Sequence, residues 1–251
     1  MFSLFGEHKE YYGNYRRRRV VVGIHQPNFF PWIGYFIKIK RSDVFIVLDE
    51  VQLSDRGYTN RTRLLNSNGS PTWMTASVNK EGHRENTIKD IKLKYTTDWK
   101  KKHLDFLLGA YRNSPYFDNT FDLVSSIYSK HQDSLIELNM DLITEILTQL
   151  EIETRIVYQS ELHYDKAAKK SDLMLDLCRC TGANTYLSGT GAMAYNEEED
   201  FSKHGIEVTY NRFETYKYKQ INSNEFIQGL SILDAFFNVG VDSVKEYIYT
   251  I

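Results

Sequence analysis

Residues 20–50 read VVVGIHQPNFFPWIGYFIKIKRSDVFIVLDE. Two stretches of this segment, 20–24 and 44–48, are apolar and rich in β-branched residues, without the alternating polar residues of a half-exposed strand. Such runs are typical of strands that are buried on both faces of a parallel sheet. Between them, residues 34–41 space their apolar side chains as a short helix does. The segment therefore predicts a βαβ unit whose two strands are neighbours and run parallel.

Polar residues follow both predicted strands at the point where each one ends. His25 and Gln26 follow the first strand, and Asp49 and Glu50 follow the second. The carboxyl ends of parallel strands meet at one edge of the sheet, and ligands of open α/β sheets bind outside that edge. The sequence therefore predicts a ligand site there.

The rest of the chain continues the alternation of helices and strands. A hairpin is expected around the turn at 68–71. Further strands are predicted at 155–158, 185–188 and 207–210, and helices at 98–111, 121–130, 135–150, 171–181 and 227–237. We expect an α/β fold with a Rossmann-like, mostly parallel sheet, in one domain over residues 20–251 that carries a largely helical insertion at about 97–150. Residues 1–19 are expected to form a poorly ordered basic tail, since it ends in four arginines.

The composition limits the classes of function. The chain has 251 residues, 41% of them hydrophobic, and its 31 Lys and Arg residues nearly balance 33 Asp and Glu residues, for a net charge of -2. This balance disfavours DNA and RNA as partners, because nucleic-acid binding needs a basic surface.

No apolar run reaches the roughly 18 residues of a membrane span, and residues 1–6 are too short for a signal-peptide core, so the cytoplasm is expected. Cys178 and Cys180 are expected to be reduced, and no metal-binding motif occurs.

The turn after the first strand carries the strongest candidates for a ligand site. Pro27 and Pro31 fix the backbone and would hold the neighbouring side chains in set directions. The candidates in this turn are His25, Gln26, Asn28, Trp32 and Tyr35. The two aromatic residues among them would supply stacking faces. A purely structural corner is the alternative.

A second group of candidates follows the second strand. Asp49 and Gln52 offer oxygen atoms for general base catalysis, a metal ion or a sugar hydroxyl. Polar and cationic side chains then recur at Arg56, Asn60, Arg61 and Arg63. Guanidinium groups in this region would bind a phosphate or a carboxylate through two hydrogen bonds. Arginine alternating with other residues is also common on an exposed strand.

A third candidate is the turn SGTG, which begins at Ser188 and Gly189 and is followed by Tyr195. Its glycines would let backbone N–H groups approach an anion. The turn is neither a P-loop nor the dinucleotide-binding fingerprint, so it is a weak signal by itself.

Taken together, these motifs resemble the WbqC-like protein family from Val22 to about Tyr247. The matching marks are the turn at 25–36, the segments 43–52 and 60–61, Trp99 with His103, Lys170-Ser171, residues 186–189 with Tyr195, and residues 231–234. The resemblance implies a bacterial protein found with genes for the biosynthesis of O-antigen, a part of lipopolysaccharide, and of other surface polysaccharides. Proteins of this family are described as glycine or aminoacyl transferases.

A fainter likeness connects the first βαβ unit to the HxGH nucleotidylyltransferases and pantothenate synthetase. Trp32 and Tyr35 stand where those enzymes have the two histidines of the motif, which stabilise nucleotide phosphates during transfer. Adenylyl transfer would therefore depend on another group, such as His25.

We expect an enzyme that transfers a small acyl or aminoacyl group, such as glycyl, to the amine of a nucleotide-linked amino sugar. His25 or Asp49 would take the proton from the amine, and the ordinary pKa of histidine near neutrality favours His25. Phosphate or carboxylate binding is expected of Arg61, Arg63 and the Ser188-Gly189 turn, and hydroxyl or amide binding of Gln26, Asn28 and Asn60.

Two other functions stay open at this point. One is a nucleotide-activating transferase or ligase of the HxGH type, and the other is a non-catalytic sugar-binding subunit of the same pathway. A nucleotide sugar is the expected partner. The acyl donor is acyl-CoA, ATP with a free amino acid, or aminoacyl-tRNA, and the near-neutral charge balance disfavours tRNA. Association into a homo-oligomer is left open.

Overall fold

The centre of the molecule is a five-stranded parallel sheet. The computed structural model describes residues 18–55, 57–79, 86–193 and 198–251. The strands of the sheet are β1 (Val21–His25), β2 (Val44–Val47), β5 (Arg155–Tyr158), β6 (Thr185–Ser188) and β7 (Glu207–Tyr210). Their order is β5-β2-β1-β6-β7, and all neighbours are parallel. In chain order this is 3-2-1-4-5, the arrangement of doubly wound nucleotide-binding sheets. The prediction of an α/β fold with a mostly parallel sheet is confirmed.

The predicted βαβ unit is present at the middle of this sheet. β1 pairs with β2 so that Val22 lies opposite Val44 and Ile24 opposite Ile46. Helix α1 (Ile33–Lys40) connects the two strands. The unbroken apolar runs form buried strands because helices cover both faces of the sheet. The likeness to the HxGH enzymes stays a prediction.

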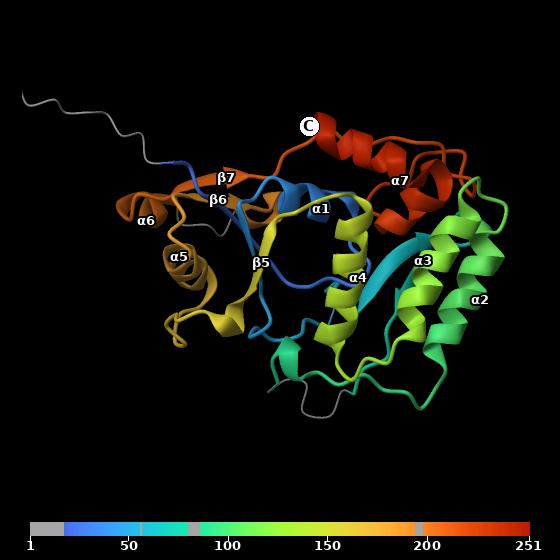
Figure 1. Ribbon diagram of the computed structural model, residues 1–251, viewed down its shortest axis with the longest axis horizontal. Helices are drawn as coiled ribbons and strands as arrows, with labels where there is room; N and C mark the ends of the chain where they lie inside the picture. Colours follow the sequence, from blue (N-terminus) through green and yellow to red (C-terminus); the bar gives the residue numbers. More distant parts are fainter. Residues whose placement is uncertain (1–17, 56, 80–85, 194–197) are drawn as a thin grey trace, which may run out of the picture.

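Each face of the sheet has its own hydrophobic core. Val44 and Ile46 pack with α5 (Lys170–Cys180) and α6 (Glu198–Lys203). Phe45 and Val47, on the other face, pack with α1, α4 (Leu135–Gln149) and α7 (Ile232–Thr250). In Figure 1, α5 and α6 accordingly lie to the left of the sheet, and α1, α4 and α7 lie to the right.

A separate hairpin and three helices lie between β2 and β5 in the chain. The hairpin pairs β3 (Arg61–Leu65) with β4 (Pro71–Thr75). The helices are α2 (Trp99–Tyr111), α3 (Phe117–Ser129) and α4. A short 3₁₀ helix at Ile88–Asp90 also lies in this segment, and two others, Gln159–Glu161 and Thr190–Ala192, lie later in the chain. These α-helices fall within the range expected for a helical insertion. The division into one domain stays a prediction. The tail expected over 1–19 also stays a prediction, because residues 1–17 lie outside the described ones.

The helix ends follow from local capping groups. Asp98 caps α2 by accepting a hydrogen bond from the backbone N–H of Lys101, as the sequence predicts. The last helix differs from its predicted range, 227–237. It begins at Ile232, after the cap Ser231, and continues to Thr250 with a kink at Gly240, which has a positive φ of 80°. None of the helices in the described part of the chain has the length and apolar character that a membrane span needs.

Candidate functional site

The order of the strands reverses at the central strand β1, and the ligand site is expected at the carboxyl end of this strand. β2 and β5 lie on one side of β1, whereas β6 and β7 lie on the other. The pairing of β1 with β6 ends at Gly23 and Leu187, one residue before Ile24. Because the two strands are parallel, Ser188 and His25 lie at the same edge of the sheet. Crevices for ligands form at such a reversal of strand order.

His25 presents one free ring nitrogen at this edge. Its Nδ1 lies 3.0 Å from the carbonyl oxygen of Gln26, which can only accept, so Nδ1 carries the proton and Nε2 carries a lone pair. Nε2 has no hydrogen-bond partner among the described residues. Desolvation, together with the positive charge of Lys38, lowers the pKa of His25 to about 4. The imidazole is therefore neutral near pH 7. It is also a weaker base than an ordinary histidine, so the prediction of a pKa near neutrality, by which the sequence favours His25 over Asp49, is wrong.

Lys38 is a part of this edge that the sequence analysis did not single out. Its Nζ donates a hydrogen bond of 2.7 Å to the carbonyl oxygen of Ile24, and the residue is 4% exposed. Burial lowers the pKa of Lys38 to about 7. The signal in the sequence was a lysine between Ile37 and Ile39 in a predicted helix, because lysines within an apolar segment are rarely buried without a partner.

A series of aromatic rings extends from His25 to the surface. The ring of His25 meets the edge of Trp32 at 5.8 Å between centroids, and Trp32 meets Tyr58 at the same spacing. Tyr58 contacts Trp73 at 5.4 Å, and the guanidinium of Arg61 lies 4.1 Å from the centre of the Trp73 ring. Trp73 is 42% exposed. The series thus presents a partly exposed stacking surface that leads to the imidazole.

Tyr35 packs against His25 inside the protein and is not exposed to solvent. Its ring lies 5.1 Å from the His25 ring, and its hydroxyl donates to the carbonyl oxygen of Gln26. Burial raises the pKa of Tyr35. With 1% of its surface exposed, Tyr35 cannot take the phosphate-binding role of the second HxGH histidine.

The turn after β1 is anchored to α4 by one buried amide. Asn139 donates from Nδ2 to the carbonyl oxygens of Pro27 and Thr59, at 2.8 and 2.6 Å. Thr59 in turn donates to the side-chain oxygen of Gln26. Asn28 is 3% exposed within this turn. Gln26 and Asn28 therefore belong to a rigid corner, next to His25. Asn139 was missed because a single amide on an apolar helix face gives no indication of its partner.

Asp49 and Gln52 lie farther along the edge. The carboxylate of Asp49 accepts two hydrogen bonds from Ser160, one from its N–H at 3.0 Å and one from its hydroxyl at 2.5 Å. Glu50 is paired with Lys89 and Lys166, and these partners lower its pKa to about 2. Gln52 is exposed. The acidic groups thus join the end of β2 to the segments beside it.

The two arginines of strand β3, Arg61 and Arg63, have different contacts. Arg61 donates from Nε to the carbonyl oxygen of Gly57. Within the described residues it has no carboxylate partner, so its charge remains available to an anion. Arg63, opposite Trp73 in the hairpin, lines a cavity beside Trp32. Asn60 donates to the carbonyl oxygen of Ala76 and ties the hairpin together.

Ser188 and Gly189 end β6 at the same edge as His25. Ser188 is fully buried, and its carbonyl oxygen accepts a hydrogen bond from the N–H of Asn211. Gly189 has an ordinary negative φ, and a Cβ there would meet no atom within 4 Å, so nothing in the local geometry requires glycine. Tyr195 and Arg56 lie outside the described residues.

His103, which the family resemblance includes, joins elements of the core. Its Nε2 lies 3.1 Å from the carbonyl oxygen of Thr75 and its Nδ1 lies 2.9 Å from the hydroxyl of Tyr128. Nε2 must donate to the carbonyl, so Nδ1 accepts from the tyrosine. Desolvation lowers the pKa of His103 to about 4. These contacts indicate a structural role.

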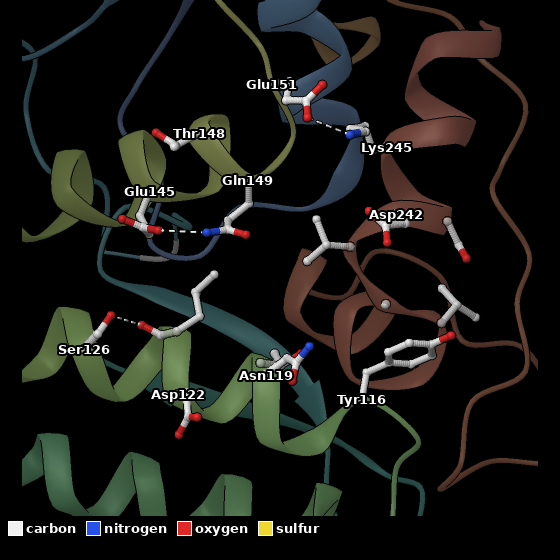
Figure 2. A pocket seen from close by; sticks show the side chains of 16 residues that line it. Tyr116, Asn119, Asp122, Ser126, Glu145, Thr148, Gln149, Glu151, Asp242 and Lys245 are labelled. Carbon is white, nitrogen blue, oxygen red and sulfur yellow. Dashed lines mark hydrogen bonds and ion pairs between the residues drawn. The ribbon is translucent and has the colours of Figure 1, made fainter.

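Two cavities differ in their chemistry. One, of about 400 Å³, opens beside Trp32 and Arg63, and five of the thirteen residues that line it are aromatic. The other, of about 690 Å³, lies between α3, α4 and α7. Figure 2 shows that its walls carry carboxylates, with Glu151 bound to Lys245 and Glu145 to Gln149. None of the predicted site residues lines this second cavity. Among the described residues, no group of three or more His, Cys, Asp or Glu side chains could hold a metal ion.

Comparisons with known proteins agree with the resemblance seen in the motifs. An uncharacterized protein of Mycobacterium tuberculosis, Rv1507c, is 34% identical over 224 residues, which cover 88% of this chain and 95% of that protein. No solved structure matches the chain. The model of the WbqC-like protein family matches residues 26–246. The chain therefore belongs to the WbqC-like protein family.

Proposed function

We propose that this protein transfers a small acyl or aminoacyl group to the amine of a nucleotide-linked amino sugar for a bacterial surface polysaccharide. The observation that carries the proposal is the neutral imidazole of His25, whose Nε2 lone pair lies at the carboxyl edge of β1 next to the ring of Trp32. An amide-forming reaction needs an acceptor for the proton of the amine, and a sugar ring needs a flat apolar surface. Both are present at this edge.

The reaction assigns His25 one step. The sugar amine attacks the carbonyl carbon of the acyl donor, an N–C bond forms, and the bond from that carbon to the leaving group breaks. The nitrogen loses one proton, which His25 accepts on Nε2. Because its pKa is low, the imidazolium that forms is a strong acid. It gives the proton readily to the leaving group, which restores the neutral ring.

Lys38 limits the protonation of His25 before the reaction. The lysine is the more basic of the two groups, with a pKa of about 7 against about 4. A proton that enters this edge is therefore held by Lys38, whose charge adds to the desolvation that keeps His25 neutral. The hydroxyl groups of the sugar would meet Gln26 rather than the buried Asn28, and Arg61 would meet a phosphate or carboxylate of the substrate.

The test is a direct search for product. The purified protein is incubated with nucleotide-linked amino sugars and with acetyl-CoA, with glycine and ATP, or with glycyl-tRNA, and the sugar is analysed by mass spectrometry. We expect one donor to add its acyl mass. The variant His25→Asn keeps a donor for Gln26 but lacks Nε2, and should lose about 100-fold or more of the rate. His131→Asn, at an exposed histidine, is the matched control.

Other results would contradict the proposal in distinct ways. Binding of the nucleotide sugar without product from any donor indicates a sugar-binding subunit. Release of pyrophosphate from ATP without acylated sugar indicates nucleotide-activating chemistry of the HxGH type.

A further inference from the structure

The cavity beside Trp32 has walls of aromatic rings. Its volume of about 400 Å³ is within the range of small-molecule sites. The rings that line it are those of Trp32, Phe213, Tyr216, Tyr218 and Phe226. Planar aromatic walls favour a planar ligand, because stacked rings gain contact area with little loss of conformational freedom. A nucleobase has this shape.

Hydrogen bonds behind the walls hold the rings in place. The hydroxyl of Tyr218 donates to the carboxylate of Asp234 at 2.7 Å, and Gln220 donates to the same oxygen at 3.0 Å. Gln220 also exchanges two hydrogen bonds with the backbone of Ile227, which closes the loop that carries Phe226. Asp234 is fully buried at the start of α7. These contacts fix the position of Tyr218 and the loop that carries Phe226.

The lining of the cavity includes one positive charge, that of Arg63. Ile33 and Gly34, the first residues of α1, line the cavity as well. Trp32 precedes the helix without capping it through its side chain, and its carbonyl oxygen accepts a hydrogen bond from the N–H of Tyr35. A Cβ on Gly34 would lie 2.5 Å from Phe213 and 2.8 Å from the indole nitrogen of Trp32. Glycine thus lets the two rings close around the helix start.

We propose that this cavity binds a nucleoside diphosphate, with the base between the aromatic rings and the phosphates toward Arg63. The inference rests on the proposed function only in identifying the nucleoside diphosphate with the carrier of the amino sugar. Trp32 lines the cavity and also contacts the His25 ring at 5.8 Å, so a sugar attached to the diphosphate extends past Trp32 toward His25. The larger cavity of about 690 Å³ is excluded for this ligand, because its carboxylates would repel phosphates.

Binding is tested with UDP, dTDP, CDP and GDP as the probes, by calorimetric titration of the intact protein and by quenching of tryptophan fluorescence. We expect at least one of them to bind the parent protein. Phe213→Ala removes a stacking wall and Arg63→Gln removes the positive charge, and each should weaken binding at least tenfold. Arg155→Gln, at an exposed arginine where β5 begins, should bind as the parent does. If Phe213→Ala does not fold, Arg63→Gln decides, since that side chain is only partly buried.

The outcomes separate this inference from the proposed function. Nucleoside diphosphate binding that depends on Phe213 and Arg63, with no acylated product from any donor, supports the cavity and contradicts only the transfer reaction. Acyl transfer whose KM for the nucleotide sugar is unchanged in both variants overturns the inference and leaves the reaction standing. Absence of binding of all four diphosphates at millimolar concentration also overturns it.

Discussion

The ammonium group of Lys38 donates a 2.7 Å hydrogen bond to the carbonyl oxygen of Ile24, at the level where β1 and β6 stop pairing. Successive carbonyls of a strand point to opposite sides. Since the carbonyl of His25 accepts from Leu48 on the β2 side, that of Ile24 points toward β6. Lys38 therefore supplies the donor that a continued β6 ladder would have supplied. The charge placed there adds to the desolvation that lowers the pKa of His25.

Removing this charge should change the titration of His25. In Lys38→Met, we expect the pKa of His25 to rise from about 4, while remaining below the ordinary value of about 6.5 because desolvation, the larger cause, persists. Nuclear magnetic resonance of the ring nitrogens across pH 3 to 8 measures the shift. Lys40→Met, two residues along the same helix and stacked over Tyr249, should leave the His25 pKa unchanged. An equal shift in both variants would remove Lys38 from this role.

Asp49 should contribute to stability rather than to the reaction. Asp49→Ala leaves the N–H and hydroxyl of Ser160 without their acceptor and should lower the free energy of unfolding by about 1 to 3 kcal/mol. Ser160→Ala removes only the hydroxyl donor and should cost about 1 kcal/mol. Because the residues are in direct contact, the double variant should lose less than the sum. Urea denaturation measures all three. Loss of acyl transfer in Asp49→Ala at unchanged stability would instead place this carboxylate in the reaction.

His103 should make the protein less stable in mild acid. Its folded-state pKa of about 4 lies below the unfolded value of about 6.5, so the unfolded chain takes up the proton first as the pH falls. This residue should therefore cost about 2 kcal/mol of stability between pH 6.5 and pH 5. In His103→Gln that part of the pH dependence should disappear, and in His131→Gln it should persist. Identical pH slopes of the unfolding free energy in all three proteins would contradict the assignment.

Two glycines should respond oppositely to the same substitution. Gly240→Ala places a Cβ at a positive φ of 80° and 2.8 Å from the ring of Tyr116, so it should lower the free energy of unfolding by about 1 to 3 kcal/mol. Gly109 lies inside α2, where a Cβ meets no atom within 4 Å. Gly109→Ala should raise stability by about 0.5 to 1 kcal/mol. Denaturant unfolding of both variants checks the pair, and destabilisation by Gly109→Ala would contradict the helix geometry.

The sequence by itself determined the centre of the fold and the edge of the sheet at which the polar candidate residues lie. The runs 20–24 and 44–48 predicted adjacent parallel strands because burial on both faces leaves a local mark, a run of apolar residues without alternation. The polar residues directly after these runs were found for the same reason. A strand end is a local feature, so the position of His25 at the edge of the sheet could be predicted without knowing how distant segments pack.

Only the tertiary structure decided which groups act together at that edge. Asp49 meets Ser160, which is 111 residues away in the chain, and not His25. The role of Lys38 depends on the point at which β1 and β6 stop pairing. The aromatic cavity is lined by the start of α1, by the middle of β3 and by the segment 213–230. Periodicity specifies which side of an element is buried, but the partner of a buried charge and the shape of a cavity depend on how remote segments pack.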